Sequence, residues 1–170
     1  MRILTTIFLL LLSELTFSQS QCEYKIDSLK IILNENIPSF IDSLSKATLI
    51  TKNNIDSIPV IIKLAILCWN KEFSIANQNE PFQVTDALGL GEKLPWRQLI
   101  YLGVSEHYVI FVYKHGGFAL ENHILLFRLE GNEIVDLWGG YSPKEVKNKM
   151  EVLAYLKTIK NQINSGYIIL

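Results

Sequence analysis

The chain has 170 residues, of which 49% are hydrophobic, and its formal net charge is −1. This near-neutral charge argues against a nucleic-acid partner, because nucleic-acid-binding proteins use a basic surface to displace counterions from phosphates. The hydrophobic content is sufficient for a folded core and argues against a disordered chain.

The first twenty residues have the order of a secretory signal peptide. A cationic start at Arg2 is followed by an apolar run over residues 3–12 and by a polar segment with small residues. The apolar run is about half of the ~20 residues that a membrane-spanning helix needs. We therefore predict a signal peptide of residues 1–18, with cleavage possible as late as Ser20. The mature protein is then extracytoplasmic, secreted or periplasmic, with no integral membrane span and with one globular domain over residues 19–170.

The mature chain contains two cysteines, Cys22 and Cys68. In an oxidising compartment this even number predicts a possible disulfide that closes a long loop. The alternative is that Cys68 is a small buried apolar residue inside a helix, while Cys22 lies unpaired near the terminus.

Three helices are expected in the first half of the chain. Residues 24–36 carry apolar side chains at helical spacing, and Pro38 can open a second short helix. In the third, Ile58–Trp69, Lys63 is the only charged residue, and a helix that is apolar nearly all round is a buried one. We therefore predict that Ile58–Trp69 is the most buried helix.

The middle of the chain predicts an antiparallel sheet. Short strands near Phe73–Ile75 and Phe82–Thr85 are possible, and the glycine-broken segment 88–91 reads as a turn. Four runs rich in β-branched and aromatic residues follow, namely Gln98–Val104, His107–His115, Ala119–Leu129 and Glu133–Trp138. The short polar or glycine-rich connections between them have hairpin lengths, which favours a β-meander.

A final amphipathic helix is expected after the strands. Ser142, Pro143 and Glu145 resemble an N-cap, a first helical residue and the second half of a capping box. The apolar segment Tyr167–Leu170 could dock on the domain or pair as an edge strand. The predicted fold class is therefore α+β, with N-terminal helices, an antiparallel meander of four or more strands and a C-terminal amphipathic helix packed on the sheet.

Three histidines, His107, His115 and His123, are spaced eight residues apart in the predicted hairpins. If a two-residue turn follows His115, the side chains of His115 and His123 point to opposite faces of the sheet. If the loop holds three residues, then His115, Glu121 and His123 share one face, with the two imidazoles about 13 Å apart along the strands. Ligands of one zinc ion lie about 2.0–2.1 Å from it. We therefore predict no metal site and no cofactor.

Other catalytic signals are scarce in the sequence. Gly89-Leu90-Gly91 lacks the third glycine and the Lys-Ser/Thr ending of a phosphate-binding loop, and no Gly-x-Ser-x-Gly nucleophile elbow occurs. The candidate catalytic residues are therefore His115, Glu121 and His123, on either side of the Gly116-Gly117 turn.

Aromatic residues concentrate in and beside the predicted strands. One interpretation is sheet packing, which aromatic side chains favour. The other is that helices cover one face of the sheet while exposed aromatics on the second face form a binding surface. The candidate binding residues are Trp96, Arg97, Tyr113 and Trp138.

Two hypotheses for function follow, and the sequence identifies no partner. The first is a non-enzymatic secreted or periplasmic protein that binds a protein or a small ligand through the sheet side. The second is a small extracytoplasmic hydrolase with its site near the Gly116-Gly117 turn. A groove of exposed aromatics would favour binding, whereas a pocket in which His115 or His123 meets a carboxylate would favour catalysis.

Overall fold

The computed structural model describes residues 24–86 and 93–163. The predicted signal peptide and its cleavage sites, Cys22, the glycine-broken turn at 88–91 and the apolar segment Tyr167–Leu170 lie outside the described residues. Within them the helices are α2 (Ser28–Ile32), α3 (Ile37–Lys46), α4 (Val60–Trp69) and α5 (Lys149–Ile159), with a 3-10 turn at Ile55–Ser57. The strands are β1 (Ile50–Lys52), β2 (Ile75–Ala76), β3 (Arg97–Val104), β4 (Tyr108–His115), β5 (Glu121–Glu130) and β6 (Glu133–Ser142).

The sheet contains the predicted meander and extends it. Strands β3, β4, β5 and β6 are antiparallel neighbours in chain order, and β1 pairs antiparallel with the free side of β3. The two-residue strand β2 pairs parallel with the start of β3. The α+β class is therefore confirmed. Strand β2 overlaps the possible strand near Phe73–Ile75, whereas Phe82–Thr85 forms only an isolated bridge from Thr85 to Gly117, and β1 was not predicted.

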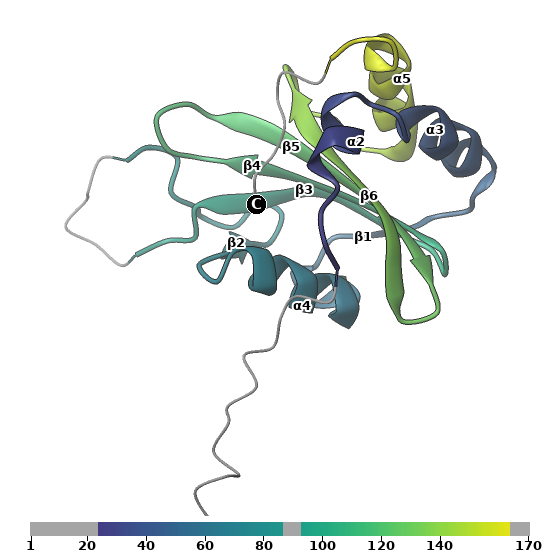
Figure 1. Ribbon diagram of the computed structural model, residues 1–170. Coiled ribbons are helices and arrows are strands. Elements are labelled where there is room, and N and C mark those ends of the chain that lie inside the picture. Colours follow the sequence, from purple (N-terminus) through teal and green to yellow (C-terminus); the bar gives the residue numbers. More distant parts are fainter. Residues whose placement is uncertain (1–23, 87–92, 164–170) are drawn as a thin grey trace, which may run out of the picture.

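Helices cover both faces of the sheet. Helices α2, α3 and α5 lie on one side and α4 lies on the other (Figure 1). Because both faces are covered, the central strands β3 to β6 carry unbroken runs of buried residues rather than a strict alternation. The core includes Phe111, Phe127 and Trp138, none of which is exposed to solvent.

The prediction that Ile58–Trp69 is the most buried helix is wrong. In α4 only Ile62 and Ile66 are buried, whereas Val60 is 71% and Leu64 is 59% exposed. The helix packs on one face of the sheet through the side that carries Ile62 and Ile66, and its other side faces solvent. The apolar composition of α4 therefore does not mean that all of its sides are buried. No helix in the described part of the chain is long and apolar enough to cross a membrane.

The predicted start of the last helix is also wrong. Ser142 is the final residue of β6, where it pairs with Asn122, and its hydroxyl donates to the Lys144 carbonyl. Helix α5 begins at Lys149, and the side chain of Asn148 accepts a hydrogen bond from the backbone N–H of Glu151. The capping residue Asn148 thus lies six residues later, because strand pairing extends β6 up to Ser142.

Candidate functional site

The connection between β4 and β5 is longer than either alternative drawn from the sequence. His115 pairs with Glu121, so all of residues 116–120 lie between the two strands. The backbone N–H groups of Gly116 and Gly117 donate to the carbonyls of Trp96 and Val84, at 2.9 and 3.1 Å. The two glycines therefore form hydrogen bonds with residues outside the hairpin and do not form a two-residue turn.

Both glycines are required by their surroundings. A Cβ atom on Gly116 would collide with the backbone of Gln83 and Val84, and Gly117 has a φ of +133°. Only glycine tolerates such a close approach and such a φ without strain. The segment before β3 thereby fixes the length of the β4–β5 connection.

This register brings the three candidate catalytic residues together. His123 pairs with Tyr113, two residues from His115, and Glu121 pairs with His115, so His115, Glu121 and His123 share one face of the sheet. One ligand atom from each of the three residues lies within 4.8 Å of the others. The imidazole centroids of His115 and His123 are 5.4 Å apart. The separation of about 13 Å, on which the prediction of no metal site depended, is therefore wrong.

His123 is a buried imidazole whose ring orientation is fixed by tyrosines. Tyr113 stacks on it with the centroids 4.9 Å apart, and Tyr141 meets it edge-on at 4.6 Å. The residue is only 4% exposed. Neither of its ring nitrogens has a hydrogen-bond partner, although Nε2 lies 3.4 Å from Oε2 of Glu121. A buried polar group left unpaired costs about 1–3 kcal/mol, so the burial of His123 lowers the free energy of unfolding.

Burial keeps both histidines of the cluster neutral. It lowers the pKa of His123 to about 3, with further lowering from the nearby His115 and Arg97. Burial, followed by the charge of Arg97, also lowers the pKa of His115. The neighbouring Glu121 carboxylate is 45% exposed, so water screens its charge. Each neutral ring consequently carries one nitrogen lone pair able to bind a ligand.

A cavity of about 510 Å³ opens beside the histidines. Its lining comes from the residues after α4, from the start of β3 and from the β4–β5 connection, and includes Asn70, Glu72, Asp86, Trp96, Arg97, His115, Phe118 and Glu121. We call this cavity, together with the adjoining His123, the strand-end site. The described residues that line it include three carboxylates and one guanidinium, so with neutral histidines these residues together carry a negative formal charge.

Arg97 is held in place inside the strand-end site. Its guanidinium lies 4.4 Å from the centroid of the Phe73 ring and donates a hydrogen bond to the hydroxyl oxygen of Tyr113. Arg97 is buried and its Nε has no hydrogen-bond partner. The cationic group is thus stabilised by an aromatic face and a phenol rather than by an ion pair.

The four candidate binding residues occupy different environments. Trp96 and Arg97 line the strand-end site, and the buried Tyr113 stacks on the ring of His123. Trp138 is fully buried on the opposite face of the sheet, where its indole N–H donates to Asn34. Sheet packing therefore accounts for Tyr113 and Trp138, and these two do not form an exposed aromatic groove.

Several residues of the strand-end site gave no signal in the sequence. Asn70, Glu72 and Asp86 come from two separate segments and belong to no recognisable motif. Their proximity depends on the contacts of Gly116 and Gly117 with the segment before β3. The nearest available indication in the sequence was the placement of two histidines and a glutamate around one hairpin.

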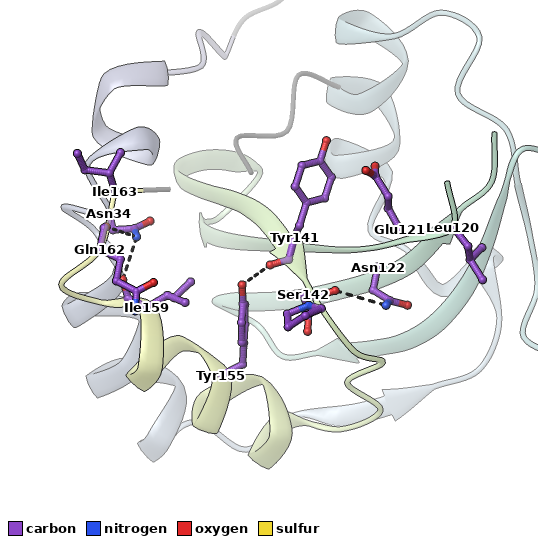
Figure 2. A pocket seen from close by; sticks show the side chains of 11 residues that line it. Asn34, Leu120, Glu121, Asn122, Tyr141, Ser142, Tyr155, Ile159, Gln162 and Ile163 are labelled. Atoms are coloured by element: carbon purple, nitrogen blue, oxygen red, sulfur yellow. Dashed lines mark hydrogen bonds between the residues drawn. The ribbon is translucent and has the colours of Figure 1, made fainter. Parts of the chain in front are cut away.

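A second cavity, of about 440 Å³, lies between the ends of β5 and β6 and the last turn of α5. Figure 2 shows Tyr155 directed at the backbone carbonyl of Tyr141, to which its hydroxyl donates, while the Tyr141 ring points away from α5. The Asn34 amide donates to the carbonyls of Ile159 and Gln162. The polar groups named here already have partners, so this cavity offers less for a ligand to gain than the strand-end site.

The predicted disulfide is only partly covered by the structure. Cys68 lies in α4, and Cys22 lies outside the described residues. The neighbouring chain is in a suitable place, because the Trp69 indole donates to the Tyr24 carbonyl at 3.2 Å and the two rings are 5.8 Å apart. The Cys22–Cys68 disulfide stays a prediction.

No family model matches the sequence, and searches of curated proteins and of solved structures likewise found no match.

Proposed function

We propose that this chain is an extracytoplasmic, non-enzymatic protein that binds a small cationic ligand at the strand-end site. One observation carries the proposal: His123 is 4% exposed, and both of its ring nitrogens lack a hydrogen-bond partner. A ligand that accepts the lone pair of this ring would recover the free energy that burial costs.

The charge of the site favours a cation. Among the lining residues that the structure describes, Glu72, Asp86 and Glu121 are opposed by the charge of Arg97 alone. The phenol and aromatic contacts of Arg97 hold it at one side of the site. Electron-pair donors on His115 and His123, together with the Glu121 carboxylate, complement a ligand that brings positive charge.

Hydrolysis is the second candidate, because His123 meets the carboxylate of Glu121 at 3.4 Å. A general base is most effective when its pKa is near the working pH. Burial lowers the pKa of His123 to about 3, which makes its ring a poor base at neutral pH. Binding is therefore the better supported of the two functions.

The test is a thermal-shift panel of small cations, containing alkyl diamines, amino-acid amides and divalent metal ions. We expect at least one panel member to raise the Tm of the mature protein and to lose that effect in His123→Leu. Leu64→Ala is the matched control, because Leu64 is exposed on α4 and is not a lining residue of the cavity. The proposal is wrong if no panel member stabilises wild type more than His123→Leu.

A further inference from the structure

We infer that the ligand of the strand-end site is a divalent transition-metal ion, held by His115, Glu121 and His123 and best probed with Zn²⁺. This inference rests on the proposed function and narrows it to one ligand class. Two imidazoles and one carboxylate are donors that zinc commonly takes, whereas calcium and magnesium prefer oxygen ligands alone.

The spacing of two of the donors fits a metal ion. Ligands about 2.0–2.1 Å from a tetrahedral zinc ion stand roughly 3.3–3.4 Å from each other. The distance between Nε2 of His123 and Oε2 of Glu121 is 3.4 Å. Acceptors around an ammonium group, at about 2.8 Å from its nitrogen, would stand roughly 4.6 Å apart. The His123–Glu121 pair is therefore spaced for a metal ion rather than for an amine.

His115 supplies the third donor from the adjacent strand. All three ligand atoms lie within 4.8 Å of one another, so a small movement of His115 completes the set. His115 is the last residue of β4 and is half-buried, which leaves its side chain room to move. His123 itself is held between Tyr113 and Tyr141, and such support around a ligand residue strengthens metal binding.

The arrangement of donors leaves room for a further ligand. Three protein donors occupy three of the four positions around a tetrahedral ion, and the fourth is commonly filled by water. Both His115 and Glu121 line the cavity of about 510 Å³. The metal would therefore be reachable from solvent, which suits an ion that is bound and released.

The experiment is calorimetric titration of untagged, EDTA-treated mature protein with zinc chloride at neutral pH. We expect one ion per chain, with affinity reduced on the order of 100-fold or more in each of His115→Ala, Glu121→Gln and His123→Gln. His107→Ala is the matched control, because His107 is a 60% exposed histidine in the same pair of hairpins, outside the cluster. Its zinc affinity should equal that of wild type, and calcium should give no heat of binding.

The outcomes separate this inference from the proposed function. Zinc binding that survives all three cluster substitutions, or that is lost in His107→Ala, overturns the metal inference. Absence of zinc binding, together with an amine that stabilises wild type but not His123→Leu, overturns the metal inference and leaves the proposed function standing. Failure of both ligand classes overturns both. Circular dichroism of each variant confirms that it is folded, and His115→Ala tests the inference without altering the buried ring.

Discussion

The indole N–H of Trp138 donates a hydrogen bond to Oδ1 of Asn34, 2.8 Å away and 104 residues earlier in the chain. The Asn34 amide donates in turn to the carbonyls of Ile159 and Gln162. One buried asparagine therefore joins the turn after α2, the edge strand β6 and the end of α5.

We predict that Asn34→Ala lowers the free energy of unfolding by about 2–4 kcal/mol, because it leaves buried groups unpaired and places alanine at a φ of 56°. Asn34→Gly tolerates that φ and should be less destabilising than Asn34→Ala. Urea denaturation measures both variants. In a double-mutant cycle, Asn34→Ala and Trp138→Phe should be non-additive by more than about 0.5 kcal/mol. Simple additivity would show that the two side chains do not interact.

The orientation of α4 gives a second prediction. Ile62 is completely buried under the sheet, whereas Leu64 is 59% exposed. Ile62→Ala should therefore cost about 2–5 kcal/mol, and Leu64→Ala should stay within about 0.5 kcal/mol of wild type. The two variants serve as controls for each other in one set of denaturation curves. The reverse order of costs would mean that α4 packs through its other face.

The covalent state of Cys68 gives a third prediction. The Trp69–Tyr24 hydrogen bond brings the chain just after Cys22 to the end of α4. We expect no reactive thiol in the denatured, unreduced mature protein and two after reduction. Cys68→Ser should lower the free energy of unfolding by roughly 2–4 kcal/mol, the usual contribution of a disulfide. Two reactive thiols before reduction would leave Cys68 as an ordinary helix residue.

The location of the protein gives a fourth prediction. Residues 1–18 have the composition of a signal peptide, with cleavage expected after Ser18 or Ser20. Mass spectrometry of protein purified from its native host should find the new N-terminus between Gln19 and Gln21. Soluble cytoplasmic protein that retains Met1 would contradict both secretion and the oxidising compartment that the disulfide needs.

Local patterns predicted the strands of this fold much better than its long-range contacts. The β-branched and aromatic content of β3 to β6 is a property of each segment, so these strands could be located within a few residues. Ser142 shows the limit, because its helix-capping signal lost to pairing with Asn122 on the neighbouring strand. The apolar composition of α4 likewise did not indicate which side of the helix meets the sheet.

The structure brings the three candidate catalytic residues together in a geometry that the sequence did not predict. His115, Glu121 and His123 were identified from their spacing, and their proximity depended on the length of one loop. That length is set by hydrogen bonds from Gly116 and Gly117 to Trp96 and Val84, which are distant in the sequence. A pair of glycines between strands favours a short hairpin turn when only local preferences are weighed. The contact with another segment decided the register instead.

The last prediction concerns the acid stability of the metal-free protein. In the unfolded chain His123 has a pKa of about 6.5, while burial lowers its pKa to about 3 in the folded protein. Between these values the unfolded state binds a proton that the folded state does not. The contribution of His123 to the pH dependence of the free energy of unfolding is therefore most favourable above about pH 6.5. This contribution is lost as the pH falls toward 3. Replacement by leucine removes this proton uptake while retaining an apolar side chain between Tyr113 and Tyr141.

We expect wild type in EDTA to lose about 2 kcal/mol of unfolding free energy between pH 7 and pH 5 that His123→Leu retains. Urea denaturation at half-unit intervals of pH measures the difference between the two proteins. Comparison within this range limits the contribution of carboxylates, which titrate mainly near pH 4. His107→Ala controls for a histidine outside the cluster and should follow the wild-type curve. Parallel curves for wild type and His123→Leu would show that the ring of His123 is solvated in the folded protein. Burial of the unpaired ring would then cost no free energy, and the main argument for ligand binding at this site would be lost.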